Sequence, residues 1–231
     1  MRENTLCRIG LHVGIAICIL STAALMPTVA QSQTSNRSEF PGRRVGGGTR
    51  GECLMNSQSL VALNPVNNLG VTASDRPIVY FAVPQSEQSY PIQFVLRDAD
   101  GHSAYETTLT TNKAQELVGV QLPSNTVKAG QDYQWYFSVV CDPEDSSQNL
   151  VLSGWLRRVS AQITVQTGTD VETKLKLAQA YAGAGLWSDQ IATLAELRQT
   201  NPHNEQVRGQ WQQLLKTLEL QQVFSLSIAR Q

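Results

Sequence analysis

The stretch Gln131–Cys141 constrains the fold most, because every second side chain in it suits a buried position. These alternating residues are Tyr133, Trp135, Phe137, Val139 and Cys141. Successive side chains of a β-strand point to opposite faces, so these five lie on one side of an extended strand. We predict that this side faces the hydrophobic core and that the strand forms the centre of the domain.

The N-terminus has the pattern of a secretory signal peptide. Arg2 and Arg8 give a charged start, Ile9–Leu25 is apolar, and small residues precede a cleavage site that we place after Ala30. An uncleaved membrane anchor is the alternative, because the apolar stretch approaches the ~17 residues that a spanning helix needs. Cleavage would leave no stable membrane span and would place the mature chain outside the cytoplasm, in the periplasm or secreted.

The cysteines follow from this cleavage. Removing residues 1–30 takes Cys7 and Cys18 away and leaves Cys53 and Cys141. Two cysteines in an exported protein favour a disulfide. Two free buried thiols are the alternative, but the chain has no Cys-x-x-Cys pair and no Cys/His spacing typical of a metal site. We therefore predict that Cys53 and Cys141 are bonded to each other.

The glycine-rich segment 31–52 carries the arginines Arg43, Arg44 and Arg50. One interpretation is a flexible linker between the signal and the domain. The other is an arm that docks a partner or an anion, because glycines allow backbone N–H groups to converge. A phosphate-binding loop is excluded by the missing Gly-x-x-x-x-Gly-Lys-Ser/Thr spacing.

Residues 53–166 carry short alternating apolar runs separated by turn residues, which predicts an antiparallel β-sandwich of the immunoglobulin or fibronectin type III kind. The expected strands are 60–63, 78–83, 92–97, 104–110, 117–122, 133–141 and 150–165. Tyr133 follows a turn that ends in Gly130, as in fibronectin type III and related domains. That resemblance implies a corner tyrosine whose hydroxyl bonds back to the turn.

Residues 167–220 change to a helical period and predict about three helices, with residues 221–231 as a tail. Thr169 and Glu172 have the form of a capping box. Gly185 should end the first helix, Ser188 should cap the second, and Asn201-Pro202 should stop it. The third helix, about 204–218, should bury one stripe, namely Val207, Trp211, Leu214 and Leu218.

The first two helices resemble a single tetratricopeptide repeat. The matching positions are Ala178, Tyr181, Gly185, Trp187, Leu194, Leu197 and Pro202. Gln190 departs from the pattern, because that repeat prefers Ala there. One repeat is too few for a stable solenoid with a peptide groove, so the helices should pack on the sandwich or dock a partner.

Few residues suggest chemistry. The formal net charge of −1 argues against nucleic acid, which requires a concentrated basic face. Asp98–Gly101 contains an Asp-Gly turn between two strands and lacks the other ligands of a calcium loop. His102 and His203 have no triad-like or metal-binding spacing. We expect no cofactor, no metal and no catalysis, although paired carboxylates of a hydrolase would not be recognisable from spacing.

The whole mature chain resembles a family of exported cyanobacterial proteins known only as a numbered domain of unknown function. The matching stretches are Pro41–Cys53, Trp135–Pro143, Gly154–Val159 and Leu194–Pro202. The resemblance implies no established activity. It makes a docking arm as plausible as a linker, and it also allows the glycines to be a structural wrap close to the sheet.

We therefore predict an exported binding protein of the cell envelope that engages another protein through the arm, the helices or both. A carbohydrate or small-molecule binder is the alternative, with Tyr136 and Trp155 as candidate ligand-facing aromatics. A hydrolase with unrecognised carboxylates is the third hypothesis.

Overall fold

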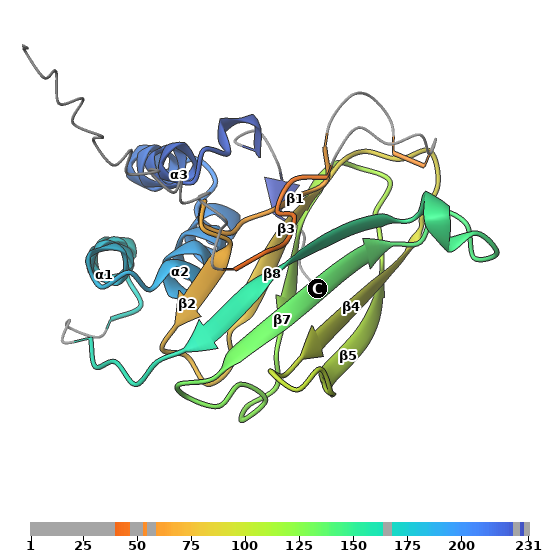
Figure 1. Ribbon diagram of the computed structural model, residues 1–231. Helices are drawn as coiled ribbons and strands as arrows, with labels where there is room; N and C mark the ends of the chain where they lie inside the picture. The colour runs from red at the N-terminus through yellow and green to blue at the C-terminus, as the bar shows by residue number, and fades with distance from the viewer. Residues whose placement is uncertain (1–39, 47–52, 55–58, 164–167, 224–226, 229–231) are drawn as a thin grey trace, which may run out of the picture. The chain divides into compact units, whose positions relative to one another are not determined.

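Two β-sheets and a layer of three α-helices make up the fold (Figure 1). The computed structural model describes residues 40–46, 53–54, 59–163, 168–223 and 227–228, all of which belong to one compact unit, Arg37–Gln231. The predicted signal segment and Arg50 lie outside the described residues.

The larger sheet has five strands and the smaller sheet has four. The order in the larger sheet is β2 (Leu69–Thr72), β8 (Leu150–Arg158), β7 (Asp132–Val139), β4 (Pro91–Arg97) and β5 (Ser103–Thr110). The order in the smaller sheet is β1 (Val61–Ala62), β3 (Ile78–Val83), β6 (Glu116–Gln121) and β9 (Ser227–Ile228).

The main hydrophobic core lies between the two sheets. Tyr133, Trp135, Phe137 and Val139 of β7 are buried in it, which confirms the predicted inward side of this strand. Phe81 of β3 comes from the facing sheet and stacks on Phe137, with 3.9 Å between the ring centroids. Because side chains from both sheets share this cluster, the sheets pack face to face as a sandwich.

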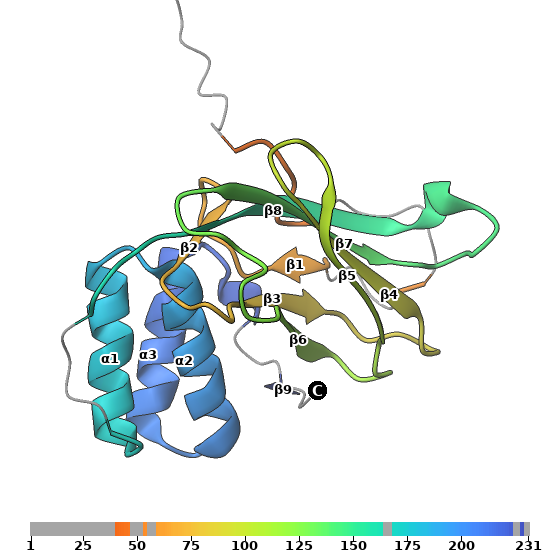
Figure 2. The same ribbon diagram turned by 90° about the horizontal axis from the view of Figure 1, so that it is seen from below.

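The smaller sheet is buried on both faces. Alternate residues of β3 point to opposite sides: Phe81 enters the core between the sheets, whereas Tyr80 and Ala82 contact the helices. Figure 2 shows the helices beside this sheet, with the larger sheet on its other side. A continuous apolar strand such as β3 is typical of a strand covered on both faces.

The helices are α1 (Val171–Gly183), α2 (Trp187–Thr200) and α3 (Glu205–Thr217), and η1 (Ser146–Gln148) and η2 (Gln221–Val223) are short 3₁₀ turns. The predicted stripe of the third helix is confirmed, since Val207, Trp211, Leu214 and Leu218 are all buried. Within the described ranges, no helix has the length and hydrophobicity that a membrane crossing requires.

Two predicted helix caps are wrong. Asp170, not Thr169, caps α1, and its side chain accepts a hydrogen bond from the backbone N–H of Thr173. The first residue of α2 is Trp187, so Ser188 lies inside the helix and is buried against the sheet. Asp and Thr are comparable caps, and the sequence alone does not separate adjacent candidates.

The sheets are mixed rather than purely antiparallel. β2 runs parallel to β8, pairing Leu69–Thr72 with 155–158, and β9 runs parallel to β6. β2 was not predicted, because a four-residue strand containing a glycine has little alternation to recognise. The two-sheet domain followed by helices is confirmed, whereas an immunoglobulin-like or fibronectin-like strand arrangement is not.

Three local predictions are confirmed. The Asp98–Gly101 turn joins the antiparallel strands β4 and β5, with Gly101 at a φ of +83°. The Tyr133 hydroxyl accepts a hydrogen bond from the backbone N–H of Lys128 at 3.2 Å, as a corner tyrosine does. Cys53 and Cys141 form a disulfide, with their Cα atoms 5.5 Å apart and a sequence separation of 88.

Candidate functional site

The arginine-glycine arm is built into the fold over residues 40–46. The backbone of Arg43 pairs with Ser153 in the larger sheet, through hydrogen bonds of 2.9 and 3.0 Å. Three residues later, the backbone N–H of Gly46 donates to Leu60 O at 2.7 Å, beside β1 of the smaller sheet. The arm therefore bridges the edges of both sheets, and this segment is not a flexible linker.

Gly42 allows the arm to approach the sheet this closely. Its φ is +155°, and a Cβ atom added there would lie 2.5 Å from both the Asn68 side-chain nitrogen and Ser153 O. A residue with a side chain would be strained and would clash with backbone. The interpretation of the glycines as a structural wrap is supported at this position, while the glycines at 47 and 48 lie outside the described residues.

Arg44 binds inside the protein rather than facing a partner. Its guanidinium donates to Leu218 O at 2.6 Å and to Asn64 O at 3.3 Å, and it lies 3.9 Å from a carboxylate oxygen of Glu219. Leu218 is the C-terminal cap of α3, where a cation stabilises the unpaired carbonyl groups and the helix dipole. Burial lowers the pKa of Arg44, and Glu219 opposes this effect.

Arg43 has a different environment from Arg44, because its side chain is exposed. Since Arg43 is paired with Ser153 across the strands, the two side chains lie on the same side of the larger sheet. Of the three predicted docking arginines, Arg43 therefore keeps an exposed side chain, Arg44 is held within the fold, and Arg50 lies outside the described residues.

The two predicted ligand-facing aromatics are half-buried. Trp155 packs edge-to-face against Phe40 at 5.8 Å between centroids, and its indole N–H donates to Pro41 O at 2.8 Å. The Arg157 guanidinium lies over the other aromatic of this group, 5.4 Å from the Phe40 ring centroid. Trp155 thus anchors the arm to the sheet, whereas Tyr136 lies in the middle of β7.

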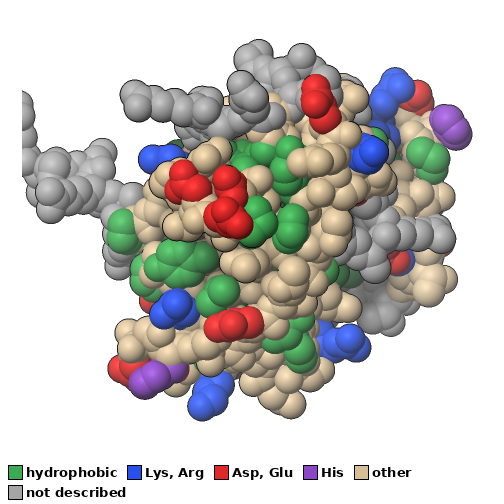
Figure 3. Space-filling view, turned by 90° about the vertical axis from the view of Figure 1, so that its right-hand side faces the viewer, with side chains coloured by type: hydrophobic (Ala, Val, Ile, Leu, Met, Phe, Trp, Pro, Cys, Tyr) green, Lys and Arg blue, Asp and Glu red, His purple; other side chains and the backbone are tan. Residues whose placement is uncertain are grey.

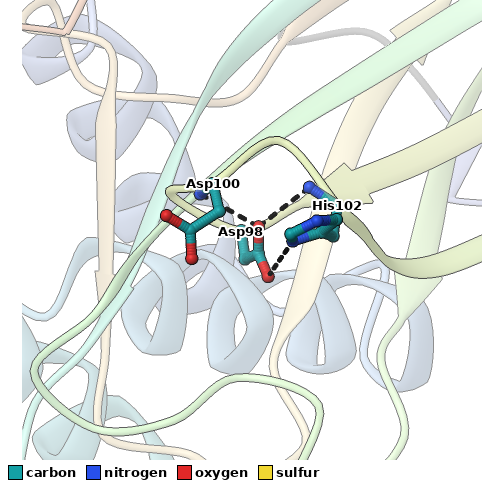
Figure 4. A group of neighbouring side chains, drawn as sticks. All are labelled: Asp98, Asp100 and His102. Carbon is teal, nitrogen blue, oxygen red and sulfur yellow. Dashed lines mark hydrogen bonds and ion pairs between the residues drawn. The ribbon is translucent and has the colours of Figure 1, made fainter.

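The acidic hairpin turn brings Asp98, Asp100 and His102 together (Figure 4). One Asp98 oxygen accepts the backbone N–H groups of Asp100 and His102 at 3.0 and 2.9 Å. The other lies 3.7 Å from Nδ1 of His102, whose side chain is exposed. These contacts are those of an Asx-type turn, so the cluster is explained by the hairpin and does not indicate a metal site.

Two carboxyl groups have a raised pKa, and each is bonded within the fold. Burial raises the pKa of Asp189, although the Ala73 N–H and the Thr72 hydroxyl, both at 2.7 Å, act in the opposite direction. Burial also raises the pKa of Glu116, which accepts the backbone N–H of Asn112 at 2.6 Å. Both carboxyl groups therefore hold backbone N–H groups of the fold.

The helices pack on the smaller sheet, and no described helix covers the outer face of the larger sheet, meaning the side that points away from the smaller sheet. The centre of this face is uncharged, because the neighbours in register there on β4, β5, β7 and β8 are Gln93, Val95, Thr108, Tyr136, Ser138 and Val151. Charged side chains surround this centre on the same face, namely Arg97, Glu106, Asp132 and Arg157. Val151 is 44% exposed. Surfaces with few charges and an aromatic residue are typical of protein interfaces.

The side of the molecule that carries η1 and the edge of the larger sheet is shown in Figure 3. Backbone and side chains that are neither charged nor hydrophobic fill most of this view, with hydrophobic side chains in several places, one cluster of acidic side chains and scattered basic ones. The lack of a continuous charged field agrees with the low net charge and does not favour a polyanionic partner.

The two aromatics named from the sequence, Tyr136 and Trp155, both lie on the outer face, since Trp155 pairs with Gln134 of β7. The sequence did not indicate the face as a whole, because its strands come from distant parts of the chain and their order was unknown.

Comparison with known proteins gives one finding about relationship. The model of a protein family described as Domain of Unknown Function (DUF928) matches residues 45–228. No curated protein matches the chain. The matched range includes both sheets, the disulfide and all three helices.

Proposed function

The chain belongs to the DUF928 family of unknown function, and from this premise we propose that it is an exported, non-catalytic protein that binds another protein of the cell envelope. The proposed binding surface is the outer face of the larger sheet, with Arg43 at its border. This differs from the arm and the helices, which the sequence favoured as docking elements.

The observation that carries this proposal is that the smaller sheet is covered on both faces, whereas the described elements cover the larger sheet on its inner face. The smaller sheet is packed on both faces, and its second face holds the helices through a shared cluster that includes Tyr80, Leu117 and Trp211. No described element packs in the same way over Tyr136 and its neighbours on the outer face. The centre of this face is uncharged and carries half-exposed Tyr136 and exposed Val151, so a partner can bury it at little desolvation cost, with the charged side chains at the rim of the contact.

An extracytoplasmic location is supported by the disulfide, because disulfides are more typical of oxidising compartments. Binding rather than catalysis is supported by the raised-pKa carboxyls Asp189 and Glu116, because both accept hydrogen bonds from backbone groups of the fold.

The test is quantitative cross-linking capture from an envelope extract with residues 31–231 as bait. We compare the wild-type chain with Tyr136→Arg, and with Gln206→Arg as a matched control that adds the same charge to an exposed position of α3. The proposal expects one protein to be captured by the wild type and by the control and to be lost with Tyr136→Arg. Equal capture by all three would refute the outer face as the binding surface.

Carbohydrate binding is the second candidate, favoured by the position of Tyr136 beside hydroxyl and amide side chains such as Ser138 and Gln134. Trp155 contributes less than the sequence suggested, since Phe40 packs against it and its N–H is bonded to Pro41 O. Retention on immobilised cell-wall glycans that is lost in Tyr136→Ala would favour this candidate over a protein partner.

A further inference from the structure

We propose that two copies of this chain pair through their β5 strands, forming one continuous ten-stranded sheet across a two-fold axis. β5 is the outermost strand of the larger sheet, next to β4, and it is eight residues long. The inference concerns the edge of the sheet and does not depend on what binds the outer face.

The hydrogen-bonding pattern shows which backbone groups of β5 face the open edge. The N–H of Thr111 donates to Tyr90 O at 2.9 Å, which fixes the pattern of the β4–β5 ladder. Because bonded and non-bonded pairs alternate in an antiparallel ladder, Thr107 and Leu109 bond to β4. The N–H and C=O groups of Glu106, Thr108 and Thr110 then point away from β4, and no described segment pairs with them.

β5 has little of the protection that is usual for an edge strand, since the register irregularity between Leu96 and Arg97 affects only its first residues. Such strands are often short, or carry lysine or proline, or are covered by another segment. β5 has full length, contains neither lysine nor proline, and has Glu106 as its one charged residue. Its three threonines, Thr107, Thr108 and Thr110, favour extended structure.

Symmetry and charge select a register. If Glu106 lay on the two-fold axis, two carboxylates would face each other directly, which is unfavourable. If Thr107 lies on the axis, Glu106 pairs with the second copy's Thr108, and Thr108 pairs with the second copy's Glu106. This register pairs the residues of β5 from Ala104 to Thr110.

The apolar side chains of β5 fit the same register. Tyr105 and Leu109 are partly buried and pack against the border of the core between the sheets. With Thr107 on the axis, Tyr105 lies opposite the second copy's Leu109, and the contact occurs twice by symmetry. The pairing in this register would therefore extend the hydrophobic core of each copy across the β5 edge, because apolar side chains of the two copies face each other.

Sedimentation velocity over a concentration series tests the proposal, using the oxidised chain from residue 31 onward. The wild type should show a concentration-dependent doubling of mass. Thr108→Pro should weaken the association about tenfold or more, because each dimer loses two N–H donors. The N–H of Thr108 has no partner within β4–β5, so the monomer should still fold. Thr108→Val keeps the donor and should associate like the wild type.

Cross-linking gives an independent readout of the register. Thr107→Cys places the same residue on both sides of the axis, within reach of a disulfide, whereas Glu106→Cys does not. We expect a covalent dimer under non-reducing conditions with Thr107→Cys and little with Glu106→Cys. A wild type that stays monomeric at all concentrations, or a dimer unaffected by Thr108→Pro, would overturn the proposal. The capture experiment with Tyr136→Arg could still succeed in that case, because Tyr136 lies on β7.

Discussion

Replacing Arg44 with Met tests whether the arm arginine stabilises the fold or serves a partner. Methionine keeps an unbranched apolar stem of similar length and removes the guanidinium group. The wild-type group donates to Leu218 O at 2.6 Å and to Asn64 O at 3.3 Å. The substitution therefore removes a link between the N-terminal arm and the end of α3, 174 residues away in the sequence.

The expected loss follows from these contacts. A hydrogen bond from a charged donor contributes about 1.5–3 kcal/mol, and the shorter bond to Leu218 O should supply most of it. The bond to Asn64 O is long, and the contact with Glu219 spans 3.9 Å to a side chain that is 71% exposed, so the ion pair contributes little. Because the site is only partly buried, we expect a loss of about 2 kcal/mol in the free energy of unfolding. This corresponds to a melting temperature about 4–8 °C lower.

Urea unfolding followed by tryptophan fluorescence measures this loss, and hydrogen exchange at the last turn of α3 reports its location. Arg43→Met is the matched control, since the exposed Arg43 is held through its backbone and should change stability by no more than about 0.5 kcal/mol. If Arg44→Met were as stable as Arg43→Met, with unchanged exchange in α3, the structural role of Arg44 would be refuted.

Three further predictions concern the Cys53–Cys141 disulfide, the buried carboxyl group of Asp189 and the hydroxyl group of Tyr133. Reduction of the Cys53–Cys141 disulfide should add two hydrogens to the intact mass and lower the free energy of unfolding by about 2–4 kcal/mol; an unchanged mass would exclude the bond. Burial raises the pKa of Asp189 in the folded state above its value in the unfolded chain, so protonation of this carboxyl group stabilises the fold. This stabilisation is complete below about pH 4, and it is lost as the pH rises through the pKa of the folded state. Urea unfolding from pH 7 to pH 4 should therefore favour the wild type increasingly over Asp189→Asn, and a pH-independent difference would contradict this assignment. Tyr133→Phe removes the hydroxyl that bonds Lys128 N–H and should cost about 1 kcal/mol, whereas an unchanged melting temperature would show that water replaces it.

Local periodicity predicted most of the elements because each pattern is written in neighbouring residues. The alternation in β7 and the stripe of α3 depend only on which side of one element is buried. The disulfide was predicted by elimination, since signal cleavage would leave two cysteines. The helix caps were less accurate, because Thr169 and Asp170 are both competent caps and tertiary packing places the helix start.

The order of the strands could not be predicted in this way. The parallel pairing of β2 with β8 joins residues 69–72 to residues 155–158, and no local pattern encodes that contact. The role of Arg44 was hidden for the same reason. An arginine in a glycine-rich segment has the same sequence pattern whether it is solvated or bonded to a distant helix, and Leu218 becomes its neighbour only after the helices have packed on the sheet.

The packing of the helices explains why the arm, the sandwich and the helices form one structural unit. The second face of the smaller sheet presents Val61, Tyr80, Ala82 and Leu117, which would be an exposed apolar surface without the helices. The arm runs beside β1, where the Ala62 N–H donates to Arg44 O, and from there the Arg44 side chain binds Leu218 O at the end of α3. The family match from residue 45 to residue 228 spans both sheets and the helices, and it begins directly after Arg44. The helices therefore act as the cover of the smaller sheet, whereas no described element covers the outer face of the larger sheet or pairs with the free edge of β5.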